Sequence, residues 1–168
     1  MASTSRNTAS DRIGDVATWG THVALFYETN DDLLDTVVPY CKTGLERRES
    51  CLWFVAEPYL TTEEAWHALK DAVDALDRQR ADAKIEIASA QDWFLRGGTT
   101  FDFDRVAAAW YEKIASVLAS GDAGLRVTGD AGWVDKKEWN VLIKWEDRLN
   151  EVVRNQPVVV VCSYPLAA

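Results

Sequence analysis

The sequence lacks the features that mark a secreted or membrane-bound protein. It has only three cysteines, Cys41, Cys51 and Cys162, which lie far apart and form no CxxC motif. Because their number is odd, they cannot all pair within one chain. No apolar run resembles a secretory signal or approaches the roughly 20 residues that span a bilayer. We therefore expect a cytoplasmic protein with reduced thiols and no membrane contact.

Basic residues are also scarce. The chain of 168 residues has 18 basic and 27 acidic side chains, which gives a formal net charge of -9. The densest basic runs, Arg47-Arg48 and Lys136-Lys137, are short and are flanked by acids. A surface of this charge repels a phosphate backbone. Direct binding of nucleic acid is therefore not expected.

Strand-like and helix-like segments alternate along most of the chain. Residues 1–19 are poor in apolar side chains and are expected to form a flexible tail that precedes a single domain, residues 20–168. Five runs are typical of strands, namely His22–Tyr27, Ser50–Ala56, Lys84–Ser89, Leu125–Gly129 and Val158–Ser163. Helical crossovers between such strands predict a three-layer α/β/α fold with a mainly parallel five-stranded sheet.

Capping residues indicate where the intervening helices begin and end. Asn30 is expected to cap the first helix, and Gly44 is expected to end it in a left-handed turn. The segment Thr61–Glu64 has the pattern of a capping box and predicts the start of the second helix. Asp102 and Asp135 are the expected starts of the third and fourth helices.

Tryptophan is abundant, with eight residues in the chain. Four of them lie at strand or helix core spacings and are expected in the core: Trp53, Trp66, Trp110 and Trp139. Ile143 is expected on the same buried helix face as Trp139. Trp93 and Trp133 follow strands instead, where a large ring is not needed for helix packing. Both are therefore candidates for the wall of a ligand pocket.

The turn after the first strand has neither the glycines nor the lysine of a phosphate-binding loop. A P-loop requires G-x-x-x-x-G-K-[ST] at this position, so that backbone amides and the lysine hold the phosphates. The sequence from Tyr27 to Asp32 reads YETNDD instead, with three acids. Binding of a nucleoside triphosphate in that manner is therefore not expected.

Ligands of open parallel sheets bind beyond the carboxyl ends of the strands. The residues that follow the five strands combine acids with aromatic rings, a composition that suits a mostly apolar pocket with a few polar groups. The predicted ligand-binding residues are Tyr27, Glu28, Glu57, Trp93, Arg126, Asp130, Trp133 and Tyr164, with His22, Glu146 and Cys162 as possible additions.

No catalytic residue, metal site or cofactor is predicted. Glu57 and Asp130 stand at strand ends, but they have neither a second histidine nor a close carboxylate pair to complete a metal or acid–base site. Cys162 follows a run of valines and is expected to be a small buried hydrophobe rather than a nucleophile or redox sensor. A dyad with His22 would require the two residues to meet across adjacent strands, which the sequence does not establish.

Arg126 interrupts an otherwise apolar strand. A buried guanidinium needs a carboxylate partner to offset its desolvation, and Glu57, Asp130 and Glu146 are the candidates. A structural ion pair and a charge that anchors a ligand are both compatible with the sequence.

Several segments in order resemble one known family. They are HVALFYETNDDLLDTVVPYCKTGLERRESCLWFVAEP, QDWF, GLRVTGDAGW, the region from Trp139 to Glu146, and VCSYPL. They resemble the MEDS domain, the methanogen/methylotroph sensory domain typified by a dichloromethane-responsive repressor. The resemblance implies detection of small hydrocarbon derivatives and a fold similar to RecA-type ATPases of the circadian-clock class. The missing P-loop implies that the nucleotide scaffold is reused for binding.

The leading hypothesis is a non-catalytic sensory domain that binds a small, partly apolar molecule and signals through a partner protein or an output domain. A homo-oligomer is possible. A protein-interaction module of the partner-switching type, with a vestigial nucleotide cleft, is the first alternative. A degenerate ATPase is the second.

Overall fold

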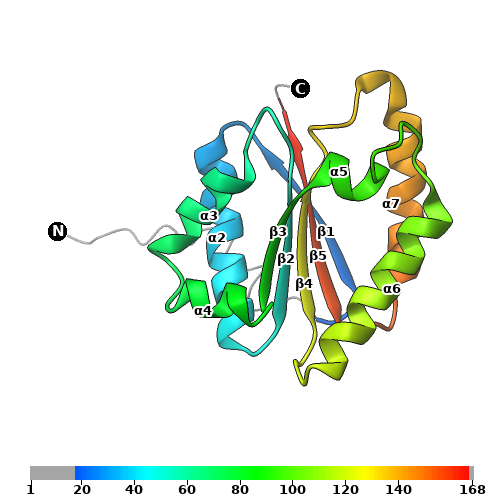
Figure 1. Ribbon diagram of the computed structural model, residues 1–168. Coiled ribbons are helices and arrows are strands. Elements are labelled where there is room, and N and C mark those ends of the chain that lie inside the picture. Colours follow the sequence, from blue (N-terminus) through cyan, green and yellow to red (C-terminus); the bar gives the residue numbers. More distant parts are fainter. Residues whose placement is uncertain (1–17, 167–168) are drawn as a thin grey trace.

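The computed structural model describes residues 18–166 (Figure 1). Its strands are β1 (Thr21–Tyr27), β2 (Ser50–Val55), β3 (Ile85–Ser89), β4 (Leu125–Asp130) and β5 (Val158–Pro165). Its helices are α2 (Asn30–Glu46), α3 (Thr62–Lys70), α4 (Leu76–Ala81), α5 (Ala90–Leu95), α6 (Phe103–Ala119) and α7 (Trp139–Val153), with a short 3-10 turn, η1 (Lys136–Glu138). The expected tail falls largely outside these residues.

All five strands are parallel, in the order β1-β5-β4-β2-β3. Helices α2, α3 and α4 cover one face of the sheet, and α5, α6 and α7 cover the other (Figure 1). The predicted three-layer α/β/α architecture with a parallel five-stranded sheet is confirmed. Among residues 18–166, no helix is both long enough and apolar enough to cross a membrane.

The valines of β5 connect the two cores. Val158 and Val160 belong to the core under α6 and α7, whereas Val159 and Val161 belong to the core under α2. This alternation leaves all four side chains buried, as expected of a parallel strand that is covered on both faces. The prediction that this apolar run forms an interior strand is confirmed.

Two of the capping predictions, at α3 and α6, are correct. Thr61 and Glu64 form the expected capping box at α3, and Asp102 caps α6. At α2 the cap is Thr29 rather than Asn30. The Thr29 hydroxyl accepts a hydrogen bond from the Asp32 amide, and the Asp32 carboxylate accepts one from the Thr29 amide. A threonine followed three residues later by an acid is the capping-box pattern.

Gly44 does not end α2 in a left-handed turn, as the sequence predicted. The helix continues to Glu46, and Arg48 takes the left-handed conformation, with φ of 61°. Gly44 instead allows α2 to lie close to the side chains of Arg126 and Cys51. A Cβ atom there would lie 2.6 Å from Arg126 Cδ and 3.0 Å from Cys51 Sγ.

The buried face of α7 also differs from the prediction. Asp135 caps η1, so that the α-helix begins only at Trp139. Trp139 and Ile143 are 44% and 58% exposed, so their predicted core positions are wrong. The buried aromatic residue of this helix is Trp145, which lies on one face with Leu149 and the last valines of the helix. Leu149 and Val153, which the helical spacing also predicted to be buried, are buried, so the prediction is wrong only in the first half of the helix.

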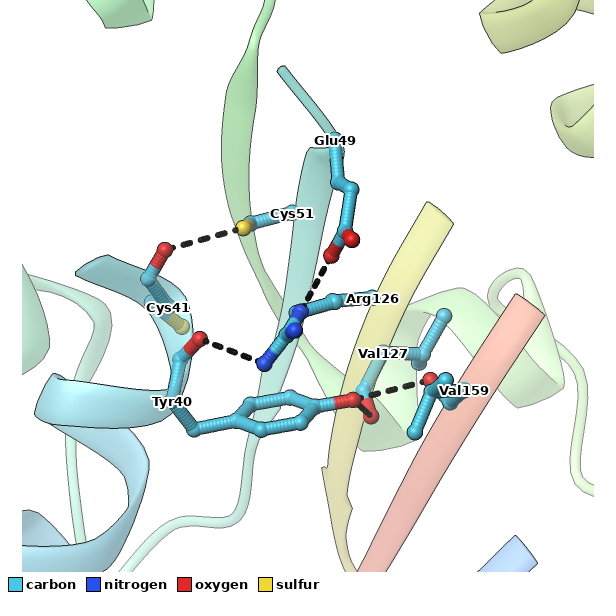
Figure 2. Close-up of polar contacts among 7 residues, drawn as sticks. All are labelled: Tyr40, Cys41, Glu49, Cys51, Arg126, Val127 and Val159. Atoms are coloured by element: carbon cyan, nitrogen blue, oxygen red, sulfur yellow. Dashed lines mark hydrogen bonds and ion pairs between the residues drawn. The ribbon is translucent and has the colours of Figure 1, made fainter. Parts of the chain in front are cut away.

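Arg126 is buried near the amino end of β4, on the face covered by α2 (Figure 2). Its guanidinium forms an ion pair with the buried Glu49 carboxylate and donates a hydrogen bond of 3.3 Å to the Tyr40 carbonyl. It also lies 4.9 Å from the centre of the Tyr40 ring. The expectation of a carboxylate partner is met, but Glu49 takes the place of Glu57, Asp130 and Glu146.

We expect Arg126→Met to lower the free energy of unfolding by about 3–5 kcal/mol, because the Glu49 carboxylate would stay buried without its partner. The double variant with Glu49→Gln should lose less, since neither charge then remains. Urea denaturation measures both effects. The control is Lys113→Met, whose more exposed pair with Glu86 is worth at most about 1 kcal/mol. Equal losses in the single and double variants would contradict this view of the pair.

Candidate functional site

A small cavity of about 40 Å³ lies at the carboxyl ends of β4 and β5, on the side of the sheet covered by α7. We call it the inner cavity. Its lining is mostly aromatic and aliphatic: Phe94, Phe101, Gly129, Asp130, Ala131, Trp133, Leu142, Trp145, Glu146 and Cys162. Four of the residues predicted to bind a ligand are therefore brought together here, namely Asp130, Trp133, Glu146 and Cys162.

Asp130 is the buried acid of this cavity, with 4% of its surface exposed. Its Oδ2 accepts a hydrogen bond of 2.6 Å from the Tyr27 hydroxyl, and its Oδ1 accepts one of 2.7 Å from the Gly132 amide. Burial raises the pKa of Asp130, although these hydrogen bonds oppose the rise. Burial likewise raises the pKa of Tyr27, with Asp130 adding to the effect. The pair ties the end of β1 to the end of β4.

An aromatic cluster forms the wall of the inner cavity. The Phe94 ring lies at its centre, with centroid distances from 5.1 to 5.9 Å to the rings of Phe54, Trp93, Phe101, Trp133 and Trp145. Trp133 stacks nearly parallel to Phe94, at an interplanar angle of 15°. The prediction that Trp133 helps to form a pocket wall agrees with this geometry. Trp93 packs on the cluster from outside and does not line the cavity.

A second cavity, of about 280 Å³, adjoins the first. We call it the outer cavity. It shares Phe101, Trp133 and Leu142 with the inner cavity and extends between the segment 95–103 and the start of α7. These three side chains therefore separate a small inner space from a larger outer one.

His22, Glu146 and Cys162 meet beside the inner cavity. His22 Nε2 lies 3.0 Å from Glu146 Oε2 and 3.1 Å from Cys162 Sγ, and His22 Nδ1 lies 2.9 Å from Asn150 Oδ1. Glu146 and Asn150 are one turn apart on α7. On the sheet, His22 pairs in register with Val160, two residues before Cys162. The contact between His22 and Cys162 across adjacent strands, which the sequence could not establish, is present.

The environment of these groups shifts their pKa values. Burial lowers the pKa of His22, but hydrogen bonds with Glu146 and Asn150 outweigh that effect, and the pKa is raised overall. Burial raises the pKa of the Cys162 thiol well above its ordinary value, with the charge of Glu146 adding to the rise. Burial also raises the pKa of Tyr164, whose hydroxyl interacts with Cys162 and Glu146. The neutral thiol agrees with the expectation that Cys162 is not a nucleophile.

The remaining predicted residues lie apart from the inner cavity. Glu28 and Glu57 are exposed at the ends of β1 and β2. Tyr164 does not line the cavity itself, but its hydroxyl interacts with Cys162 and Glu146, which do, and its ring stacks on Phe26 at a centroid distance of 5.4 Å. Arg126 is paired near the opposite end of β4, so its predicted place in a ligand pocket at the strand carboxyl ends is wrong.

Six residues that line the inner cavity were not among the predicted ligand-binding residues, namely Phe94, Phe101, Gly129, Ala131, Leu142 and Trp145. Phe94 lies on α5, a short helix that the sequence analysis treated as a loop. Phe101 lies before α6, away from any strand end. Leu142 and Trp145 carried a usable signal, because their spacing from each other and from Leu149 is helical.

The Asp32 amide in the first turn of α2 is already in use. A phosphate bound there would need free amides at the helix amino terminus. The Thr29 hydroxyl accepts the Asp32 amide, and Asp31 and Asp32 place negative charge in the first turn. The acidic turn noted in the sequence therefore forms a closed helix cap.

Comparison with solved structures places the chain among proteins with RecA-like folds. A KaiC-like protein of Pyrococcus horikoshii matches 89% of the chain at 14% identity, with a TM-score of 0.57. The flagellar accessory protein FlaH of Methanocaldococcus jannaschii matches 97% at 12% identity, with a TM-score of 0.52. The chain spans 65% and 69% of the lengths of these two proteins. Identities this low show the shared fold alone, as the sequence resemblance implied.

The family model of the MEthanogen/methylotroph, DcmR Sensory domain, or MEDS, matches residues 21–168. Because this match covers nearly the whole chain, the protein belongs to the MEDS family of sensory domains. No curated protein matches the sequence. The resemblance inferred from the sequence motifs is confirmed.

We expect Tyr27→Phe to lower the free energy of unfolding by about 1–3 kcal/mol, because the buried Asp130 carboxylate loses its hydroxyl donor. Thermal or urea denaturation measures the change. The matched control is Tyr111→Phe, since Tyr111 lies exposed on α6. Similar losses in the two variants would show that the bond between β1 and β4 adds nothing to stability.

The raised pKa of Asp130 predicts a pH dependence. A carboxyl group with a raised folded-state pKa stabilises the fold fully below its ordinary pKa of 3.8, and this contribution is lost as the pH rises through the folded-state value. The free energy of unfolding of the protein minus that of its Asp130→Asn variant should therefore decrease as the pH is raised from acid to neutral. A difference that stays constant or rises with pH in urea titrations would refute a raised folded-state pKa for Asp130.

Proposed function

We propose that this domain is a non-catalytic sensor that binds a small, partly apolar molecule in the inner cavity and signals through a partner protein or an output domain. The inner cavity is the observation that carries the proposal. Its walls are mostly aromatic and aliphatic, while Asp130, Glu146 and Cys162 supply a few polar groups. This combination is typical of small-molecule sites, in which polar groups orient a ligand that apolar walls bind.

The size of the cavity restricts the ligand. A volume of about 40 Å³ corresponds to about three water-sized spheres. Short haloalkanes and alcohols are of this size, whereas a nucleotide is far larger. The outer cavity of about 280 Å³ adjoins it and offers a route for entry or room for a longer molecule.

The closed cap of α2 argues against a nucleotide hydrolase. The Thr29–Asp32 capping box occupies the amides of Thr29 and Asp32, and the acids of the first turn repel phosphate. The two proteins with similar folds are only 14% and 12% identical to the chain. Their likeness therefore does not carry an activity over to it.

The Tyr27–Asp130 hydrogen bond offers a route for a signal. It joins a residue that lines the inner cavity to the end of β1, which is an edge strand of the sheet. A ligand can transmit a signal only if it binds two states of the protein with different affinities. We propose that a change in the position of Asp130 provides that difference. The three free cysteines agree with a reducing, cytoplasmic environment.

A protein-interaction module is the second candidate. Phe26, Trp139, Ile143 and Leu166 are 44–63% exposed on β1, on α7 and just after β5. Exposed apolar side chains of this kind are typical of surfaces that bind other proteins.

Tryptophan fluorescence tests ligand binding directly. Titration with dichloromethane or ethanol should change the emission saturably, because Trp133 and Trp145 line the inner cavity. Ala131→Leu should fill the space and weaken binding at least tenfold. The matched control Ala115→Leu enlarges an exposed residue of α6 and should bind normally.

Trp133→Phe should remove part of the fluorescence response, whereas Trp66→Phe on the opposite face should leave it intact. The sensor proposal fails if neither probe produces a saturable response. It also fails if Ala131→Leu binds as tightly as the unaltered protein. A stable complex recovered with a partner protein under these conditions would favour the interaction module.

A further inference from the structure

The side chains of His22, Glu146 and Cys162 come from β1, α7 and β5, and they converge on one point. The ring nitrogen, carboxylate oxygen and thiol sulfur all lie within 4.8 Å of one another. Only 9% of the His22 side chain, 23% of the Glu146 side chain and 8% of Cys162 are exposed. Three potential metal ligands are thus held by three different elements and largely shielded from solvent.

We propose that His22, Glu146 and Cys162 bind a divalent transition metal ion of the zinc class, with one coordination position open toward the inner cavity. Nitrogen, oxygen and thiolate sulfur are the donors that zinc uses in proteins. Three protein ligands and one open position are the arrangement of zinc sites that bind a water or a substrate.

The distances between the donors are close to those of a coordinated ion. Zinc bonds of about 2.1 Å to nitrogen and oxygen and 2.3 Å to sulfur place tetrahedral ligand atoms about 3.3–3.6 Å apart. His22 Nε2 lies 3.0 Å from Glu146 Oε2 and 3.1 Å from Cys162 Sγ. The two His22 contacts are a few tenths of an ångström shorter than these spacings, and the donors of Glu146 and Cys162 lie within 4.8 Å of each other, so rotation of the three side chains must adjust all three distances to admit the ion.

Asn150 orients His22 for this role. Its Oδ1 lies 2.9 Å from Nδ1 and can only accept a hydrogen bond, so a metal-bound, neutral imidazole would keep its proton on Nδ1. The lone pair of Nε2 would then be free to bind the ion between Glu146 and Cys162. Histidine ligands of metals usually donate their other ring N–H to such an oxygen, which fixes the tautomer and the ring orientation.

The charges of the site also fit a divalent cation. A glutamate carboxylate and a cysteine thiolate together carry two negative charges, which neutralise the ion in a place with little solvent. Binding deprotonates the thiol and displaces the proton on His22 Nε2, and both protons go to solvent, because the metal binds a thiolate and a neutral imidazole. The alternative is a plain His22–Glu146 ion pair beside a buried thiol, which would require no ion.

The site also bears on the proposed function. Glu146 and Cys162 line the inner cavity, so an ion that they bind borders the space in which we propose the sensed molecule binds. The open position would accept a water or a polar atom of that molecule. The metal site itself does not depend on the proposed function, because the ion is titrated without any organic ligand.

The test is a titration of the metal-free, untagged protein with Co²⁺ and then with Zn²⁺. Co²⁺ should bind with a stoichiometry of one and produce a thiolate-to-cobalt charge-transfer band, which Zn²⁺ displaces. Cys162→Ser should abolish the band. Asn150→Ala should weaken Zn²⁺ binding by about 10–100-fold, as is usual for residues that orient a ligand. His22→Ala should weaken it further.

The matched controls are Cys41→Ser and His67→Ala, which change the same residue types elsewhere and should leave the titration unchanged. X-ray absorption of the unaltered protein with Zn²⁺ should show one sulfur among nitrogen and oxygen ligands. This measurement needs no variant, so it tests the site even if a substituted protein does not fold. No charge-transfer band, a band that persists in Cys162→Ser, or a first shell without sulfur would overturn the proposal. Metal binding without a ligand response would instead refute only the proposed function.

Discussion

The rest of the structure depends on the burial of one charge, the guanidinium of Arg126. It lies inside the layer between α2 and the sheet, where an unpaired cation would be very costly. Glu49, just before β2, supplies the opposite charge, and Tyr40 supplies a carbonyl and a ring face. A side chain at position 44 would occupy the space of the aliphatic part of Arg126, so glycine is required there. The path of α2 over the sheet is therefore set by a single strand residue.

The two faces of the sheet are consequently specialised. The face under α2 is held by the Arg126 ion pair and by the Tyr40 hydroxyl, which donates a hydrogen bond of 2.9 Å to the Val159 carbonyl. The face under α7 is filled by aromatic rings, which leave the inner cavity at the carboxyl ends of the strands. The Tyr27–Asp130 hydrogen bond joins the carboxyl ends of β1 and β4.

The fold could be predicted from the sequence because its signals are local. The five apolar runs, the capping box at Thr61 and the valines of β5 each specify their own structure with little help from distant residues. The face of α7 was wrong because Trp139 and Ile143 follow the same helical spacing as buried residues, while the first turn of α7 remains exposed.

The candidate site was predictable only in part, for a different reason. Asp130 and Trp133 follow a strand directly, so the topology of a parallel sheet is enough to place them near a ligand. The predicted strand Leu125–Gly129 already placed Arg126 at the amino end of the strand, but its partner Glu49 could not be assigned, because that contact depends on how β2 and α2 pack against β4. The contact of His22 with Cys162 required the β1–β5 register, and Phe94 required a short helix that sequence periodicity does not reveal.

The ring cluster around Phe94 also has a spectroscopic consequence. Trp93, Trp133 and Trp145 each lie within 6 Å of this one phenylalanine, in fixed and different orientations. Aromatic chromophores that are held so close in an asymmetric arrangement couple with one another and give strong near-ultraviolet circular dichroism. The domain therefore contains an intrinsic optical probe in its own interior, and a small rotation of the Trp133 ring would alter the spectrum without any attached label.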